Sequence, residues 1–202
     1  MDKRYARTTK ALSFEIIPSI RPFSNFEFID SLFGGSWPLR RILSQVRQMG
    51  GKTITKERLD FSEDIFEENT DIQKLCPKYN PTQGEVFRLG FFNVSIHSPT
   101  DITKIRSQNF LGYTIIKHNI IPATSGVSEK DINNFVIYES VIKTGRHDNN
   151  YIKRSPQWEC VVQDKLFNIT GYLYAQQNSI SNCCAHVAIR TAAGAFYSRD
   201  IS

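Results

Sequence analysis

The stretch from Gln176 to His186 consists of Gln176-Gln177-Asn178-Ser179-Ile180-Ser181-Asn182-Cys183-Cys184-Ala185-His186, and it decides the fold that we predict. It follows the run Leu166–Tyr174, whose aromatic and β-branched residues favour a strand. Asn182 is a natural N-cap for the alanine-rich run that begins at Cys183. The sequence therefore predicts a strand end, a short polar loop and a helix with two cysteines in its first turn.

This arrangement suits nucleophilic chemistry. The free N–H groups and the positive dipole end of a helix lower the pKa of a thiol in its first turn, which favours Cys183 or Cys184 as a nucleophile. A side-chain amide from Gln176 or Gln177, together with a backbone N–H, could stabilise the oxyanion of a tetrahedral intermediate. Structural cysteines on such a helix are the alternative, since a buried cysteine often behaves as a small apolar residue.

These residues resemble the nucleophile region of papain-like cysteine peptidases. In that family a glutamine precedes the nucleophile by about six positions and an alanine follows it two positions later, a spacing that Gln177, Cys183 and Ala185 match. A looser resemblance is to uncharacterised bacterial proteins with a predicted papain-like or bacteriocin-processing-like peptidase fold. They have a Leu-Gly-Tyr strand, as in Leu111–Ile116. When the chain is aligned with these bacterial proteins, the nucleophile is Cys184. We favour Cys184 and keep Cys183 open.

The resemblance also implies a base histidine with an Asn or Asp partner well downstream of the cysteine. Only 18 residues follow Cys184, and the one histidine among them, His186, is too close in sequence to act as the base. The sequence therefore predicts a fragment that lacks the catalytic histidine, an upstream base such as His118, or an inactive site. His97 and His147 lie in turn-rich segments and carry no such prediction.

Composition excludes several classes of function. The 202 residues carry a formal net charge of +5, but the basic residues are spread along the chain, which does not favour nucleic-acid binding. No apolar run is long enough to span a membrane, and Glu15 and Pro18 interrupt the only candidate signal segment. The spacing of Cys76, Cys160, Cys183 and Cys184 suits neither a disulfide framework nor zinc. We therefore expect a cytoplasmic protein with no cofactor, no metal, no membrane and no nucleic-acid partner.

Three helices are expected in the first part of the chain. The first covers 24–33 and ends at Gly34-Gly35, the second follows Ser36-Trp37-Pro38 and ends at Gly50-Gly51, and the third lies around 62–75. Residues 1–20 show no clear period. Five strands are expected after Pro81: 85–94, 110–118, 134–141, 158–162 and 166–174.

Together these patterns predict an α+β fold. Residues 1–80 would form a mainly helical N-terminal region, and residues 81–202 a strand-rich module that leads into a partial papain-like domain with the cysteine-bearing helix at its C-terminus. The expected function is thiol-dependent hydrolysis of a peptide or amide bond in a peptide or protein substrate, inactive in the chain as given. The alternative is a non-catalytic binding or interaction domain that contains a papain-like element.

Overall fold

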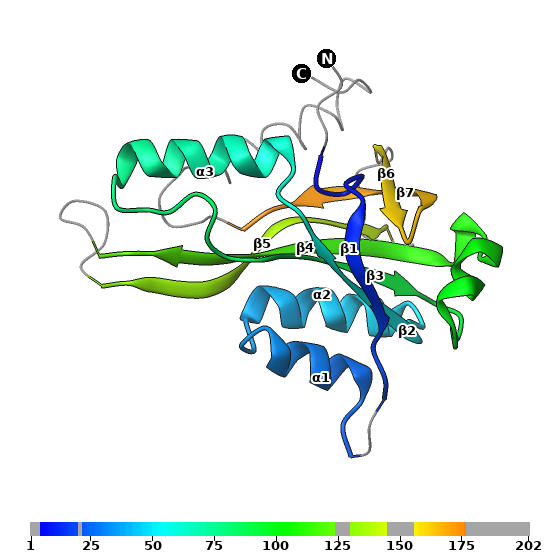
Figure 1. Ribbon diagram of the computed structural model, residues 1–202. Helices are drawn as coiled ribbons and strands as arrows, with labels where there is room; N and C mark the ends of the chain where they lie inside the picture. Colours follow the sequence, from blue (N-terminus) through cyan, green and yellow to red (C-terminus); the bar gives the residue numbers. More distant parts are fainter. Residues whose placement is uncertain (1–4, 20–21, 124–129, 145–155, 177–202) are drawn as a thin grey trace.

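The computed structural model describes residues 5–19, 22–123, 130–144 and 156–176, and its main feature is one antiparallel sheet (Figure 1). The sheet has seven strands in the order β1-β2-β3-β4-β5-β7-β6. The strands are β1 (Ala11–Ile16), β2 (Thr53–Leu59), β3 (Val86–Phe92), β4 (Phe110–Ile121), β5 (Ile132–Lys143), β6 (Gln157–Val162) and β7 (Lys165–Tyr174). Two 3₁₀ turns, η1 (Pro99–Lys104) and η2 (Ser107–Asn109), lie between β3 and β4.

The sheet is curled into a half-barrel. Its edge strand β6 donates a hydrogen bond from Val161 N to the carbonyl oxygen of Arg7 (2.9 Å), in the segment that leads into the opposite edge strand, β1. The turn between β6 and β7 also reaches back to β2, because Gln163 N donates to Glu57 Oε1 (2.8 Å). Residues far apart in the sheet order therefore meet inside the curl.

Helices cover both faces of the sheet (Figure 1). The helices α1 (Asn25–Leu32) and α2 (Trp37–Gln48) lie on one face, and α3 (Glu63–Leu75) lies on the other. Ser24 and Glu27 form a capping box at the start of α1, and Ser36 caps α2, which has Pro38 in its first turn. Gly34 and Gly35 adopt positive φ between the two helices, which allows the tight reversal.

The apolar core is divided by the sheet. On the α1–α2 face the core includes Ile29, Leu39, Val46, Leu89 and Phe91. On the α3 face, inside the curl, three phenylalanines pack together: Phe92 lies 5.2 Å from Phe110 and 5.5 Å from Phe167, measured between ring centroids. A smaller cluster of Ile72, Cys76, Tyr79 and Ile121 lies beneath the C-terminal half of α3.

The predicted fold class is wrong. The first part of the chain is not a mainly helical region, because β1 and β2 belong to it and pair with β3 in the common sheet. The cysteine-bearing helix expected at the C-terminus lies outside the described residues. The described architecture is a curled antiparallel sheet with three helices packed on it, which differs from a helical lobe joined to a papain-like core.

The individual helices and strands agree with the sequence-based prediction better than the fold class does. The three expected helices correspond to α1, α2 and α3, and the five expected strands correspond to β3 through β7. Of the two missed strands, β2 is rich in polar and charged residues. In β2, Lys56 pairs with Glu15 of β1 and Glu57 pairs with Arg88 of β3, so neighbouring strands neutralise its charges. A sequence pattern does not reveal such partners.

Candidate functional site

A buried ion pair joins two central strands on the α3 face of the sheet. Glu57 of β2 and Arg88 of β3 are direct cross-strand partners, and Arg88 Nε donates to Glu57 Oε2 at 2.7 Å. Both side chains are completely buried. A buried charge is costly without a partner, so each of these residues depends on the other.

The same arginine fixes the N-terminal segment. Its Nη1 donates to three carbonyl oxygens, those of Ala6 (3.3 Å), Arg7 (3.1 Å) and Thr9 (2.8 Å). These residues precede β1 and lie against β6, so one guanidinium group connects the middle of the sheet to the segment that bridges its edges. The guanidinium fork suits several oxygen acceptors at once.

A second group of charged side chains, centred on Glu139, lies beside the ion pair of Glu57 and Arg88. Glu139 of β5 accepts from Arg7 Nη1 at 3.0 and 3.2 Å and from the Tyr113 hydroxyl at 2.5 Å. Burial, followed by the charge of Glu139, raises the pKa of Tyr113 well above its ordinary value. The Arg7 guanidinium also lies 4.2 Å from the ring centroid of Tyr5 and 5.1 Å from that of Trp158. We call Arg7, Glu57, Arg88, Tyr113 and Glu139 the charged cluster.

The charged cluster is built for structure. Both carboxylates accept hydrogen bonds from protein donors, and the arginines are engaged with carboxylates or carbonyls. General acid–base catalysis needs a group that reaches a substrate proton. Glu57 is fully buried and Glu139 nearly so, so neither offers a carboxylate at the surface. The charged cluster therefore holds strands and the N-terminal segment together.

Cys160 of β6 lies beside the charged cluster and is completely buried. Burial raises the pKa of this thiol to about 12; Arg88 and Arg7 oppose the rise, and Glu57 and Glu139 add to it. Since the thiolate is the nucleophilic form, Cys160 is chemically inert at neutral pH. It packs as a small apolar residue of the core.

We expect Cys160 in the folded chain to resist iodoacetamide at about pH 8 and to react once urea unfolds the protein. Its folded pKa lies above the unfolded value of about 8.5, so its contribution to stability is complete below about pH 8 and is lost as pH rises toward about 12. Mass spectrometry of the Cys160 peptide measures the labelling, and urea titrations across this range measure stability. Rapid labelling without unfolding would contradict the assignment.

The predicted catalytic residues fall mostly outside the described part of the chain. Cys183, Cys184 and Gln177 are not among the described residues, so their roles stay predictions. Gln176 is described and continues the pairing of β7 along β5. Its backbone N donates to Ile137 O at 2.7 Å, and its side-chain Oε1 accepts from Ile137 N at 3.2 Å.

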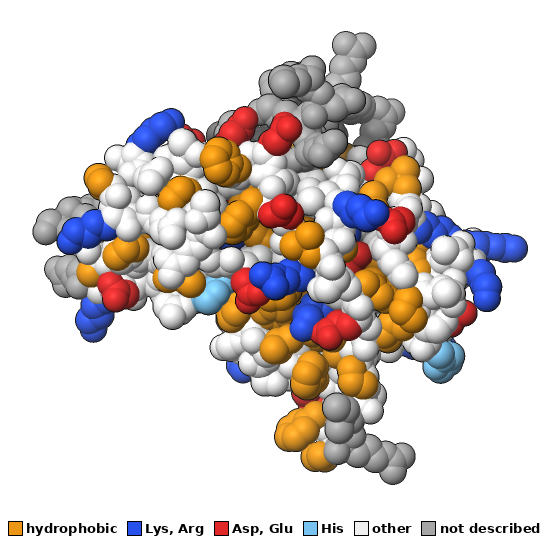
Figure 2. All heavy atoms as spheres, viewed as in Figure 1, with side chains coloured by type: hydrophobic (Ala, Val, Ile, Leu, Met, Phe, Trp, Pro, Cys, Tyr) orange, Lys and Arg blue, Asp and Glu red, His pale blue; other side chains and the backbone are white. Residues whose placement is uncertain are grey.

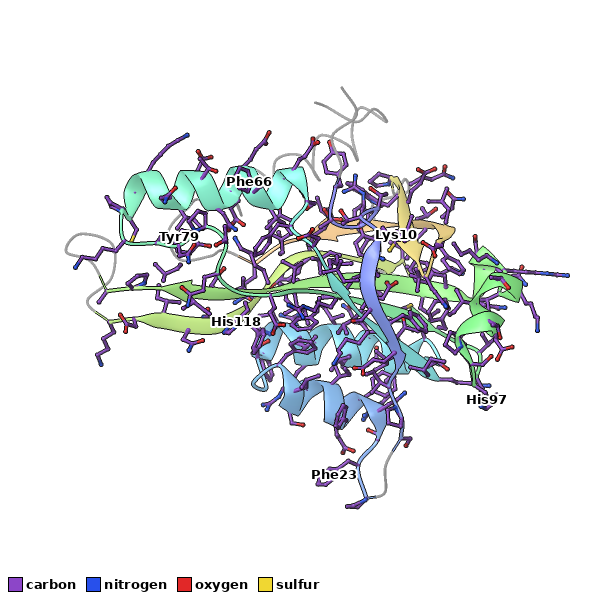
Figure 3. All side chains as sticks on the ribbon, in the orientation of Figure 1. Lys10, Phe23, Phe66, Tyr79, His97 and His118 are labelled. Atoms are coloured by element: carbon purple, nitrogen blue, oxygen red, sulfur yellow. The ribbon has the colours of Figure 1, made fainter. Side chains whose placement is uncertain are left out.

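The two described histidines are far apart (Figure 3). His118 of β4 lies 2.7 Å from Asn133 Oδ1 through its Nε2, and its ring stacks on Phe135 with centroids 4.5 Å apart. His97 lies just before η1, toward the other end of the sheet. His147 and His186 are outside the described residues. The hypothesis that His118 acts as an upstream base therefore remains a prediction. The His118 ring is held by Asn133 and Phe135 of β5.

An apolar stripe on the surface was missed by the sequence analysis. Phe23, Phe28, Leu32 and Trp37 are exposed by 61%, 37%, 40% and 71%, respectively. Phe28 and Leu32 are one turn apart on α1, Phe23 precedes the helix, and Trp37 begins α2. Figure 2 shows hydrophobic side chains gathered over this end of the molecule, and Phe23 lies at the end farthest from α3 (Figure 3). We call these four residues the hairpin stripe.

A sequence signal for the hairpin stripe exists. The inner face of α1 carries Phe26 and Ile29, which are buried, and Phe28 and Leu32 fall outside that face. A helix that is apolar on more than one side exceeds what a single core contact requires.

No group of His, Cys, Asp and Glu side chains within the described residues is arranged to hold a metal ion. Over the same ranges, no helix combines the length and the apolar character needed to cross a bilayer.

Comparisons of the chain with known protein families, with curated proteins and with solved structures found no match in any of the three. The papain-like resemblance thus depends on the quoted residues alone.

Proposed function

We propose that this chain is a protein-binding domain that contacts its partner through the hairpin stripe. The observation that carries the proposal is the exposure of Trp37, Phe23, Leu32 and Phe28 on one helical hairpin. Exposed aromatic and aliphatic side chains grouped on one surface are typical of interaction sites, whereas single exposed apolar residues are ordinary. Tryptophan and arginine are also the residues that most often dominate binding energy at protein interfaces.

Internal packing accounts for only part of the hairpin stripe. The hairpin already attaches to the sheet through its other side, where Leu39, Leu43 and Val46 are buried. Phe23 and Phe28 occupy the positions of a hydrophobic staple around the Ser24 cap, which gives them a local role. Leu32 and Trp37 have no such role and remain exposed.

The other exposed apolar residues do not form a comparable surface. Phe66 and Leu75 lie on α3, nine positions apart, which places them on opposite sides of a helix with a period of 3.6 residues. Leu12 lies on β1, and Leu166 and Tyr174 lie toward opposite ends of β7. Among the described residues, the hairpin stripe holds four of the nine exposed large apolar residues.

The charges around the hairpin stripe indicate the chemistry of the partner. The helix α2 carries Arg40, Arg41 and Arg47 and no acidic residue, and α1 carries Glu27 and Asp30, which leaves one net positive charge on the two helices (3 − 2 = 1). Arg40 is paired with Asp30, and Arg47 lies 4.9 Å from the ring centroid of Phe26, while Arg41 is exposed. An apolar anchor site with a positive rim favours a partner that offers an apolar pocket or helix face bordered by carboxylates.

The thiol hydrolase hypothesis concerns residues outside the described part of the chain and is kept as a prediction about Cys183 and Cys184. The labelling experiment on Cys160 tests it as well. Rapid alkylation of the peptide that carries Cys183 and Cys184 at neutral pH would support a nucleophile there, because a low-pKa thiol reacts before unfolding.

A peptide display library selected on the folded chain tests the proposed function. We expect enriched peptides that combine large apolar residues with Asp or Glu, and we expect their affinity to fall at least about tenfold in a Leu32→Ser, Trp37→Ser variant. The free energy of unfolding should change by less than about 1 kcal/mol, since both side chains are exposed. Titration calorimetry and urea unfolding measure the two quantities.

The matched control is Gln48→Ser, an exposed residue of the same hairpin, which should leave peptide affinity unchanged. Selected peptides that bind the double variant as tightly as the original chain would overturn the proposal. So would binding to anionic lipid vesicles with no peptide selected, because this outcome assigns the surface to a bilayer instead of a protein.

A further inference from the structure

A fully buried asparagine lies between α3 and the sheet. Asn119 of β4 is flanked on its own strand by Lys117 and Ile121, and side chains two positions apart share one face of a strand. Lys117 Nζ contacts Glu68 Oε2 of α3 at 2.6 Å, and Ile121 packs against Ile72 of α3. The Asn119 side chain is thereby placed on the α3 face, between a buried ion pair and a small apolar cluster.

Neither polar atom of the Asn119 amide, Oδ1 or Nδ2, has a hydrogen-bond partner, although both atoms are buried. Two polar side chains of α3 and its following loop, Asn69 and Tyr79, are engaged with each other. Asn69 Nδ2 donates to Pro81 O at 2.7 Å, and the Tyr79 hydroxyl donates to Asn69 Oδ1 at 2.9 Å. Tyr79 lies beneath α3 in Figure 3. Asn69 and Tyr79 therefore form hydrogen bonds with each other or with the backbone, and the Asn119 amide receives none.

We infer that this seam between α3 and β4 is a binding site for internal water, with the Asn119 amide as its main ligand. An unpaired buried amide is costly, and a small molecule that both donates and accepts hydrogen bonds satisfies its two kinds of polar atom at once. Water is that molecule, and buried waters typically bind groups of this kind. The Tyr79 hydroxyl and the Lys117 ammonium group lie on the same face to serve as further ligands.

The loop before β3 lies directly against β4 at the residue before Asn119. Gly84 has a φ of +102°, and a Cβ built on it would lie 2.5 Å from the carbonyl oxygen of His118, the residue before Asn119. Only glycine permits this approach. Because Asn119 is completely buried, water at its amide should exchange slowly with the solvent.

Water-to-protein nuclear Overhauser measurements on the folded chain test the inference, together with a high-resolution crystal structure. We expect a long-lived water signal at the Ile121 methyl groups, and density within hydrogen-bond distance of both Asn119 amide atoms. Asn119→Leu should abolish the signal, because the apolar side chain fills the space. Asn134→Leu, which changes the exposed cross-strand partner, should retain it.

Density that shows the Asn119 amide bonded directly to a protein group, with no water signal, would overturn the inference. If Asn119→Leu fails to fold, the Asn119→Ser variant replaces it: the shorter side chain should keep the water signal and add density for a further water. Loss of the water signal in a folded Asn119→Ser variant would assign the buried amide to packing alone.

Discussion

Arg88→Met is expected to lower the free energy of unfolding by about 3–5 kcal/mol, the cost of leaving one member of a buried ion pair without its partner. In this variant Glu57 keeps the hydrogen bond from Gln163 N but loses its compensating charge. The carbonyl oxygens of Ala6, Arg7 and Thr9 lose their shared donor as well. Urea unfolding of the 202-residue chain, followed by circular dichroism, measures the loss.

Two further variants separate the causes of this loss. The double variant Glu57→Met, Arg88→Met should recover part of the stability, because apolar residues of similar volume can replace a buried ion pair. Recovery should remain incomplete, since the N-terminal carbonyls still lack a donor. Lys74→Met is the control, because it breaks an exposed ion pair with Asp71 and should cost less than about 0.5 kcal/mol. Equal stability of Arg88→Met and this control would contradict a structural role for the buried pair.

Glu139→Leu is expected to cost about 3 kcal/mol, because it removes the acceptor of two largely buried donors. The Arg7 guanidinium loses both of its contacts with the carboxylate, and the Tyr113 hydroxyl loses its 2.5 Å hydrogen bond. Release of Arg7 should also loosen the segment before β1. We therefore expect faster protease cleavage within residues 5–9, in addition to the lower stability measured by urea unfolding.

Tyr113→Phe is the matched comparison for Glu139→Leu. It removes one hydroxyl and leaves the ion pair between Arg7 and Glu139 in place, so it should cost only about 1 kcal/mol and should not change cleavage near the N-terminus. Protease sensitivity that rises equally in both variants would show that Arg7 does not depend on Glu139. A Glu139→Leu variant as stable as Tyr113→Phe would contradict the proposed cost of unpaired donors.

Local signals in the sequence were sufficient to predict the positions of the helices. Ser24 and Ser36 at the helix starts, and the glycine pairs after each helix, place α1 and α2 within one or two residues of their observed ends. Apolar and aromatic runs likewise located β3 through β7. These signals act between residues close in sequence, which is why a single chain is enough to recognise them.

The candidate site was less predictable. The chemistry expected at Gln177, Cys183 and Cys184 lies outside the described residues, and Gln176 is hydrogen-bonded to β5. The hairpin stripe depends on which side of α1 faces the sheet. The sequence shows that Phe26, Phe28, Ile29 and Leu32 are apolar, but the burial of only Phe26 and Ile29 among them follows from how the helix docks.

The amino-acid sequence by itself determined where along the chain the helices and five of the strands lie, because caps, glycines and apolar periodicity are local. Only the tertiary structure decided that β1 and β2 are strands and that the sheet curls on itself. Glu57 and Arg88 lie 31 positions apart, and Arg7 and Glu139 lie 132 apart. Each of these charges is tolerated inside the protein only beside its partner, and the physical reason is the high cost of an unpaired charge in a water-free interior.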